Sequence, residues 1–289
     1  MDEESTKPQM SLTGSLSIQE EEAFFSDSKR LKRRILEVAA KKGGHFGGSF
    51  SCIDALLYLY KNVLKRHESD PEWELRDRFI MSKGHSVLAL YAVLEDLKLI
   101  RDNELDTYLE FESRLAGHAE HFHIPWIEMS TGSLGHGTNS GCGIALGARL
   151  KGQEFKVFVL VGDGELNEGS NWEAFLFATQ HNLSNFVLLV DNNGLESLDR
   201  TSEILGIEPL EMKLKSFGFS VFACDGHSFK EMSEVFSAIN EAKDLKPKAI
   251  ILDTQKGHGV SFMNGNPMWH YRELAEAELE IALSELRPK

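Results

Sequence analysis

The sequence FKVFVLV at residues 155–161 runs straight into the polar turn GDGELNE at residues 162–168. A continuous apolar run of this length, closed by glycine, is typical of a fully buried strand in a parallel sheet. A second run, NFVLLV at 185–190, ends in the turn DNNG at 191–194, and a helical pattern over 170–181 joins the two runs. Strand, helix and strand in this order predict a doubly wound α/β fold.

The rest of the chain extends the same alternation. Apolar residues recur in further segments, which we expect to form helices from Asp27 to Gly43, from near Ser51, over 86–96, over 229–243 and over 271–286, and strands over 219–223 and 249–252. No Pro- or Ser-rich linker divides these segments, so we expect one α/β domain over 25–289, with a mostly parallel sheet flanked by helices. Residues 1–24 lack periodicity and are expected to form a mobile, acidic tail.

Composition and charge exclude several classes of protein. The 289 residues are 42% hydrophobic and 26% charged, as in ordinary globular proteins. The apolar runs are far shorter than the roughly 18 residues of a membrane helix, and the acidic start is unlike a secretory signal, so we expect a cytoplasmic protein without membrane segments. The net charge of −14 disfavours non-specific binding to nucleic acid or anionic membranes. Cys52, Cys142 and Cys224 are odd in number and widely spaced, so we expect buried, unpaired thiols.

The two polar turns point to a metal and phosphate site. Thirty residues separate Asp163 from Asn193, which fits one helix and a return strand, so both turns should open on the same sheet edge, where α/β folds bind ligands. A carboxylate and a carboxamide oxygen suit Mg²⁺, or Ca²⁺, whose other ligands come from diphosphate and water. Gly-Asp-Gly alone could be a simple tight turn, but its pairing with the second turn favours the metal site.

Glycine and histidine motifs accompany these turns in a fixed order. Gly-Asp-Gly followed by about thirty residues and Asn resembles the thiamine diphosphate signature. The accompanying motifs are GHFGG at 44–48, SKGH at 82–85, GHAE at 117–120, STGSLGHG at 130–137, DGH at 225–227, KGHG at 256–259 and WH at 269–270. Together they resemble the N-terminal half of a transketolase, over roughly residues 27–275.

The resemblance implies roles for individual residues. Asp163, the Asn193 side chain and the Leu195 carbonyl would hold Mg²⁺ against the cofactor diphosphate. Three histidines match catalytic positions of the family, with the first two facing the thiazolium and the sugar: His45, His118 and His270. The other matched residues would bind the cofactor or, for the glutamate, link the two cofactor sites of a dimer: His85, Gly132, Leu134, Gly164, Asn193 and Glu168.

Two motifs depart from the family pattern. The common Gly-Pro-Leu-Gly-Gln-Gly reads GSLGHG at 132–137, and Gly-His-Pro-Glu reads GHAE at 117–120. The glycines that let the backbone approach a ligand are kept. A loop without proline, with His136 in place of glutamine, is compatible with a different sugar specificity.

The resemblance also implies that half of the active site lies on another chain. In transketolases the glutamate that activates the aminopyrimidine belongs to a pyrimidine-binding domain, and this sequence holds only the diphosphate-binding type. We therefore expect an α₂β₂ assembly with a C-terminal transketolase subunit, the pyrimidine-binding chain. Together the chains would transfer a two-carbon ketol group from a ketose or ketose phosphate to an aldose, through a thiamine diphosphate carbanion.

Two other functions remain open from the sequence. One is the α subunit of a 2-oxo acid dehydrogenase's decarboxylating component, although the motifs at 44–45 and 83–85 favour a transketolase. The other is a non-catalytic protein of the same fold that binds the cofactor or a partner, against which the sugar-facing histidines argue.

Several histidines and glycines invite other interpretations. We expect no catalytic role for three histidines: His67, His181 and His227. A zinc site at the cluster His118, His121 and His123 is disfavoured because no cysteine lies near. The glycines Gly141, Gly143 and Gly147 do not fit a dinucleotide-binding fingerprint and are expected to allow close helix packing.

Overall fold

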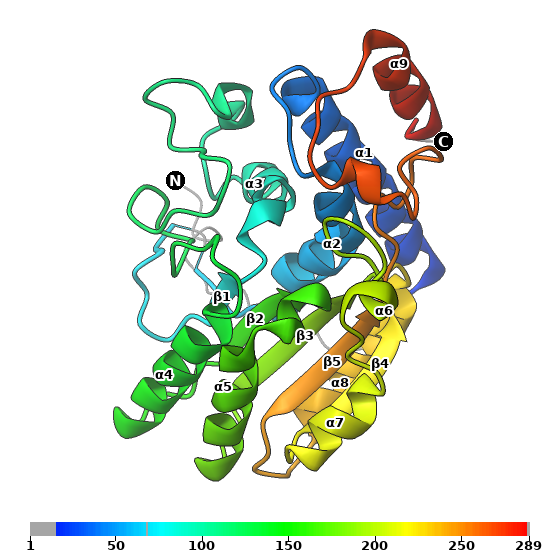
Figure 1. Ribbon diagram of the computed structural model, residues 1–289. Helices are drawn as coiled ribbons and strands as arrows, with labels where there is room; N and C mark the ends of the chain where they lie inside the picture. The colour runs from blue at the N-terminus through cyan, green and yellow to red at the C-terminus, as the bar shows by residue number, and fades with distance from the viewer. Residues whose placement is uncertain (1–15, 68, 288–289) are drawn as a thin grey trace.

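The computed structural model describes residues 16–67 and 69–287. Five parallel strands form one sheet in the order β1-β2-β3-β5-β4 (Figure 1). The strands are β1 (Arg78–Met81), β2 (Val157–Gly162), β3 (Phe186–Asn192), β4 (Ser220–Asp225) and β5 (Lys248–Asp253). The predicted α/β class is confirmed, and this sheet is parallel throughout.

Helices cover both faces of the sheet (Figure 1). One apolar core contains residues of α4 (Gly137–Leu150), α5 (Gly169–Gln180) and α7 (Leu210–Ser216). The other core contains residues of α1 (Ile18–Ala39), α2 (Phe46–Tyr58), α3 (Val87–Asp96) and α8 (Phe229–Glu241). Alternate residues of β2 enter the two cores, Val157, Val159 and Val161 on one side and Phe158 and Leu160 on the other. A strand covered on both faces needs apolar residues at every position, which explains its continuous apolar run.

Shorter elements complete the described chain. A π-helical turn, Leu59–Val63, extends α2, and the remaining α-helices are α6 (Thr201–Ile204) and α9 (Glu276–Glu285). Single 3₁₀ turns occupy Gly84–Ser86, Glu104–Thr107, Gly164–Asn167 and Pro267–Trp269. Among the helices within 16–67 and 69–287, none combines the length and apolarity needed to cross a bilayer.

The first helix begins earlier than predicted, at Ile18 rather than near Asp27. Ser17 and Glu20 form a capping box, in which the Glu20 carboxylate accepts from the Ser17 backbone N–H at 2.8 Å. The buried Phe24 ring stacks on Phe229 at 4.8 Å, which anchors the first turns. The tail predicted over 1–24 is therefore too long, and its first fifteen residues lie outside the described part of the chain.

Two other helix starts also differ from the sequence prediction. Helix α2 begins at Phe46, directly after His45, rather than near Ser51. Helix α9 begins at Glu276 rather than Tyr271, because the preceding segment is extended beside the end of α1. There Leu274 donates its backbone N–H to the Ala40 carbonyl at 2.9 Å. Tertiary contacts of this kind leave no periodic signal in the sequence.

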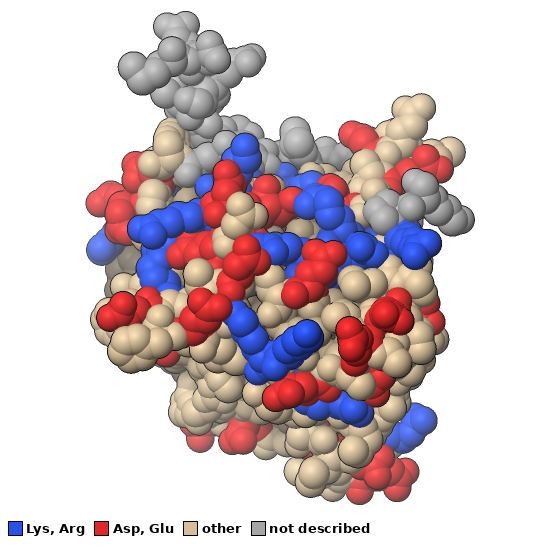
Figure 2. Space-filling model, turned by 90° about the horizontal axis from the view of Figure 1, so that it is seen from above, with Lys and Arg blue, Asp and Glu red and all other residues tan. Residues whose placement is uncertain are grey.

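The thiols and the surface charges agree with expectation. The cysteines Cys52, Cys142 and Cys224 are buried and unpaired. Figure 2 shows acidic and basic side chains interspersed on one face rather than gathered by sign. Ion pairs such as Arg34–Glu95 and Arg30–Asp96 also bind surface charges locally. An anionic ligand of large area therefore finds no broad basic surface on this face.

Only one glycine of α4 allows the close packing that was predicted for all three. A Cβ at Gly141 would lie 2.5 Å from Val159 of β2, so this glycine lets the helix approach the sheet. Gly143 and Gly147 face open space, with no atom within 4 Å of such a Cβ. Close packing therefore explains only Gly141, where α4 packs against the strands of the sheet.

Alanine substitutions in α4 should separate these two cases. Gly141→Ala should lower the free energy of unfolding by about 1–3 kcal/mol, the usual cost of overpacking. Gly143→Ala is its matched control, and alanine's better helix propensity should raise stability by up to about 1 kcal/mol. Urea unfolding of the two purified variants measures both changes, and equal effects would contradict the packing seen here.

Candidate active site

The two polar turns meet at the carboxyl edge of the sheet. Gly162 of β2 pairs with Asp191 of β3, so the residues that follow emerge side by side. Asp163 donates its backbone N–H to the Asp191 carbonyl at 3.1 Å. Its carboxylate accepts from the Gly194 backbone N–H at 2.6 Å. The predicted convergence of the two turns is confirmed.

A pocket opens over this edge. All but one of the residues singled out from the sequence line it: His45, His85, His118, Gly132, Leu134, Asp163, Gly164, Asn193, Leu195 and His270. The exception is Glu168, which is exposed at the start of α5 and packs beside Gly135. Segments that are far apart in the sequence therefore come together at one site.

The Asp163 carboxylate is held under the pocket in an unfavourable electrostatic setting. The side chain is only 1% exposed, and besides Gly194 it accepts from the Gly164 backbone N–H at 2.9 Å. Burial, together with the nearby Asp191 charge, raises the pKa of Asp163 to about 7. A divalent cation beside it would compensate both carboxylates.

The neighbouring turn supplies further oxygen atoms of the kind such a cation binds. The Asn193 amide donates to Asp191 at 3.0 Å, which turns its carbonyl oxygen the other way, where it accepts from the Leu195 backbone N–H at 3.1 Å. Asp163, Asn193 and Leu195 all line the pocket, and their carboxylate, carboxamide and backbone carbonyl oxygens are of the hard kind that binds Mg²⁺ or Ca²⁺. We call these three residues the oxygen set. Gly164 lines the pocket without a side chain that would hinder a diphosphate.

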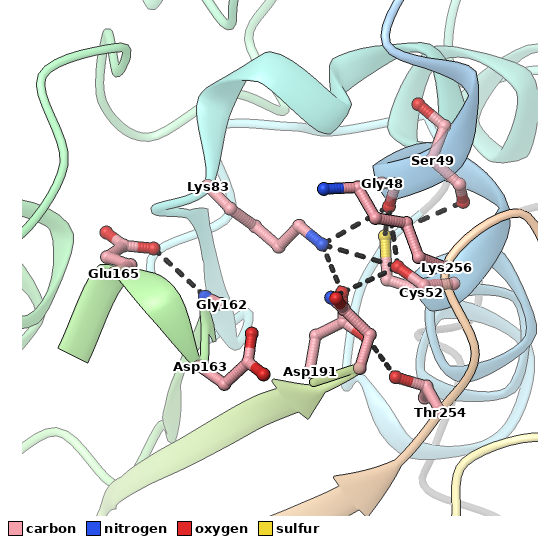
Figure 3. A network of polar contacts seen from close by, with 12 residues as sticks. Gly48, Ser49, Cys52, Lys83, Gly162, Asp163, Glu165, Asp191, Thr254 and Lys256 are labelled. Carbon is pink, nitrogen blue, oxygen red and sulfur yellow. Dashed lines mark hydrogen bonds and ion pairs between the residues drawn. The ribbon is translucent and has the colours of Figure 1, made fainter. Parts of the chain in front are cut away.

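A buried ion pair lies beside Asp163 (Figure 3). Asp191 is fully buried and pairs with Lys83, whose ammonium also donates to the Gly48 carbonyl at 3.2 Å. Ser51 and Thr254 donate their hydroxyls to the same carboxylate. Burial opposes the charged form, but the Lys83 charge still holds the pKa of Asp191 below its ordinary value.

Glu165 ties a loop to the strand ends. Its buried carboxylate accepts from the Gly135 backbone N–H at 2.9 Å, from the Gly162 backbone N–H at 3.1 Å and from the Ser82 hydroxyl. Burial raises its pKa. These bonds fix the loop that carries Gly132 and Leu134 against the turn that carries Asp163.

Four imidazoles surround the opposite side of the pocket. The His45 ring lies 5.2–5.6 Å, centroid to centroid, from the rings of His85, His118 and His270. Burial, with the neighbouring cationic groups, lowers the pKa of His45 to about 3 and that of His270 to about 4, and it lowers the pKa of His85 as well. These three rings are neutral near pH 7 and act through hydrogen bonds rather than charge.

Three of these histidines are positioned by local features of the backbone. His45 immediately precedes α2, and a Cβ at Gly48 one turn later would lie 2.6 Å from Ser86, so glycine admits the His85 turn. His118 packs over Gly132, where a Cβ would lie 3.3 Å from the ring. The buried Nδ1 of His45 has no hydrogen-bond partner within the described ranges.

Four buried charged residues at the site were not predicted from the sequence: Lys83, Glu165, Asp191 and Lys256. All four belong to the glycine-containing motifs quoted above. Lys256, 3% exposed, donates to the Glu196 carbonyl at 2.6 Å and lies 3.2 Å from Nδ1 of His270. Their charge could have singled them out, because a charged side chain that is buried near the core needs a partner of opposite charge or a hydrogen-bond partner.

A group of side chains of the types that can bind a metal ion lies outside the pocket lining. Ligand atoms of Asp54, His227 and His258 lie within 4.8 Å of one another. His227 has both nitrogens engaged, with Nδ1 2.7 Å from Asp54 and Nε2 accepting from the Gln255 backbone N–H. Its ring also stacks on the His258 ring in nearly parallel planes. Nitrogen lone pairs in two parallel rings do not point at one common ion. The distances between the three side chains would allow an ion to bind. The hydrogen bonds, however, are those of an aspartate–histidine pair.

The histidines near 120 are dispersed rather than convergent. His118 lines the pocket, whereas Nδ1 of His121 lies 2.6 Å from the Ile127 carbonyl. His123 is half-exposed and lies 3.5 Å from Glu120. This arrangement gives no support to a zinc site at these three residues.

Comparisons with known proteins agree with the geometry of the pocket. A family profile described as "Transketolase, thiamine diphosphate binding domain" matches residues 30–286. The transketolase from Leishmania mexicana superposes with a TM-score of 0.82 at 28% identity, over 94% of this chain and 42% of that one.

Two curated relatives, each named as one subunit of a transketolase, match along most of their own length. The chain is 37% identical over 262 residues to a subunit of the apulose-4-phosphate transketolase of Actinobacillus succinogenes, covering 90% of this chain and 94% of the relative. It is 36% identical over 259 residues to the 6-deoxy-6-sulfo-D-fructose transketolase subunit SqwG of a Clostridium species, covering 89% and 93%. Human transketolase is 31% identical, but only 42% of its length is covered.

Proposed function

Because the chain belongs to the family of transketolase thiamine diphosphate-binding domains, we propose that it is the diphosphate-binding subunit of a two-chain transketolase. The enzyme would transfer a two-carbon ketol group from a ketose or ketose phosphate to an aldose. One observation carries the proposal: the oxygen set of Asp163, Asn193 and Leu195 opens into the same pocket as the four-histidine cluster. The transketolase match also disfavours the 2-oxo acid dehydrogenase alternative.

The residues of this chain would bind and orient rather than react. Thiamine diphosphate, when bound, supplies the electron sink that lets a carbon–carbon bond beside a carbonyl break and re-form. Asp163, Asn193 and the Leu195 carbonyl would hold Mg²⁺ against its diphosphate. The neutral rings of His45 and His270, with His118 beside them, would exchange hydrogen bonds with cofactor and sugar oxygens.

A partner chain would complete the site. The relatives that are named as one subunit each imply a second, different chain, and we propose that this partner carries the pyrimidine-binding domain and its activating glutamate. Glu168, exposed beside Gly135, would then lie at an interface between the assembled chains. An α₂β₂ assembly places two such sites in one particle.

Co-expression with the neighbouring reading frame tests the proposal. Ketol transfer, followed over a panel of ketose and ketose-phosphate donors, should appear only when both chains are present. The isolated chain should fold and bind the cofactor weakly, because half of the contacts are missing. Full turnover by this chain alone would contradict the two-chain assignment, and cofactor binding by the complex without turnover would support a non-catalytic role.

A further inference from the structure

Lys256 and His270 are brought together over the start of α2. Gly257 donates its backbone N–H to the Gly47 carbonyl at 2.9 Å, which anchors the lysine beside the helix. A Cβ at Gly47 would lie 2.8 Å from the Trp269 carbonyl oxygen and 3.0 Å from Cγ of Lys256. The absence of a side chain at this one position lets the lysine stem and the 269–270 segment pack next to each other.

The hydrogen bonds of Lys256 define the protonation of the neighbouring ring. Its ammonium donates to the Glu196 carbonyl at 2.6 Å and lies 3.2 Å from Nδ1 of His270. A protonated lysine has three donors and no acceptor, so Nδ1 of His270 must be the acceptor in this contact. A neutral imidazole that accepts at Nδ1 carries its proton on Nε2.

We propose that Lys256 is a positioning residue that holds His270 as the Nε2–H tautomer, with that N–H available to an acceptor oxygen in the pocket. Within the part of the chain that the structure describes, no hydrogen bond to Nε2 is formed, and the ring lines the pocket. The tautomer of His270 follows from this contact with the Lys256 ammonium. Its purpose in ketol transfer rests on the proposed function.

The surrounding charges favour the same proton arrangement. Burial, followed by the charges of Lys256 and Lys83, lowers the pKa of His270 to about 4, so the ring is neutral near pH 7. Burial lowers the pKa of Lys256 to about 8, with Lys83 acting in the same direction and Asp163, Asp191 and Glu196 opposing it. At pH 7 most Lys256 side chains remain ammonium donors.

Lys83 does not act in this way, although it also lines the pocket. Its ammonium is committed to Asp191 and to the Gly48 carbonyl. The Glu196 atom that binds Lys256 is a carbonyl oxygen rather than a carboxylate. Lys256 therefore keeps a donor for the ring without being neutralised in a direct ion pair.

The proton position can be measured directly by NMR on the full chain, without partner or substrate. In protein labelled with ¹⁵N-histidine, long-range ¹H–¹⁵N spectra at pH 7 should show His270 protonated on Nε2 and unprotonated on Nδ1, with assignment by comparison with His270→Gln. The ring should stay neutral to about pH 5. A proton on Nδ1 in the wild type would overturn the proposal.

Three variants identify the lysine as the cause. Lys256→Met should raise the His270 pKa towards its ordinary value of about 6.5 and weaken the tautomer preference. Lys256→Arg keeps a cationic donor and should preserve the wild-type spectrum. Lys215→Met removes an exposed lysine from a surface ion pair and serves as the matched control. Thermal unfolding verifies that each variant is folded, and an unchanged His270 in Lys256→Met would overturn the proposal.

The complex with the partner chain gives the functional readout. Loss of one oriented, charge-assisted contact of about 1.5–3 kcal/mol predicts a roughly 10- to 150-fold lower kcat for Lys256→Met. The arginine variant should recover most of this rate. Because the NMR result does not depend on turnover, failure of the ketol-transfer assignment would leave the tautomer measurement intact. A normal kcat in a variant with an altered tautomer would remove the functional half of the proposal.

Discussion

Replacing Asp163 by alanine should abolish Mg²⁺-dependent binding of thiamine diphosphate. Asp163 is the charged member of the oxygen set, and its carboxylate also accepts the Gly194 backbone N–H that holds the second turn in place. Without it, Asn193 and Leu195 offer only neutral oxygens, and a divalent cation has little to bind. Isothermal calorimetry on the purified complex, with and without Mg²⁺, measures the loss.

Asp253→Ala is the matched control for this experiment. Its carboxylate also stands at the end of a central strand, is exposed, and does not line the pocket. Cofactor affinity should stay close to the wild-type value in the control. Retained Mg²⁺-dependent affinity in Asp163→Ala would show that the cation is held elsewhere.

The raised pKa of Asp163 also predicts how metal binding depends on pH. Without a cation its pKa is about 7, against an ordinary value of about 3.9, so the folded chain binds this proton more tightly than the unfolded chain does. This carboxyl therefore lowers folding stability as pH rises from about 4 to about 7. Mg²⁺ competes with the proton, so the rise in thermal stability on adding Mg²⁺ and cofactor should be larger at pH 8 than at pH 6. A larger rise at pH 6 would exclude Asp163 as the responsible ligand.

His118→Ala should lower kcat of the two-chain enzyme by something on the order of 10² to 10⁴, the range typical of a positioned acid–base or polar group. The ring packs over Gly132 at the pocket wall, 5.6 Å from the His45 ring. Hydrogen bonds from such a ring to the sugar should strengthen as charge develops in the reaction. Initial rates at saturating cofactor measure the effect.

The substitution should leave the loop in place, because Tyr91 donates its hydroxyl to the His118 backbone carbonyl rather than to the ring. His123→Ala is the matched control from the same loop, since its ring is half-exposed beside Glu120. Cofactor affinity and thermal stability should be unchanged in both variants. An unchanged kcat in His118→Ala would assign the ring a purely structural role.

The inner strands β2, β3 and β5 and the ligand-binding edge of the sheet could be predicted from the sequence, because strands buried on both faces leave uninterrupted apolar runs. The same runs place Asp163 and Asn193 at equivalent strand ends, so their convergence followed from the parallel topology. The edge strand β1 (Arg78–Met81) was not predicted, because its four residues are too few to leave a distinct pattern. The first residues of the helices were harder to predict from the sequence. The capping box at Ser17 was overlooked, and the extended segment before α9 depends on a backbone bond to Ala40.

Some pocket residues could likewise be predicted from the sequence, and others could not. His118 and Leu134 stand in irregular loops, where no period exists, so only the motif resemblance could select them. Lys83 and Asp191 were hidden for a different reason: their pairing joins positions 108 residues apart, and one sequence carries no record of that contact. Glu165 was overlooked because its three donors come from three separate segments.

The ion pair of Lys83 and Asp191 limits how this pocket can be redesigned. If one partner were replaced by a neutral residue, the other would be left as an unpaired buried charge, so a single substitution should disable the site. Replacing both by apolar residues of similar volume would be far better tolerated by the fold. That double change would still remove the anchor for Asn193, which donates to Asp191. Engineers seeking new sugar preferences should therefore leave this ion pair untouched and vary residues that line the pocket without contacting it, such as Ser197.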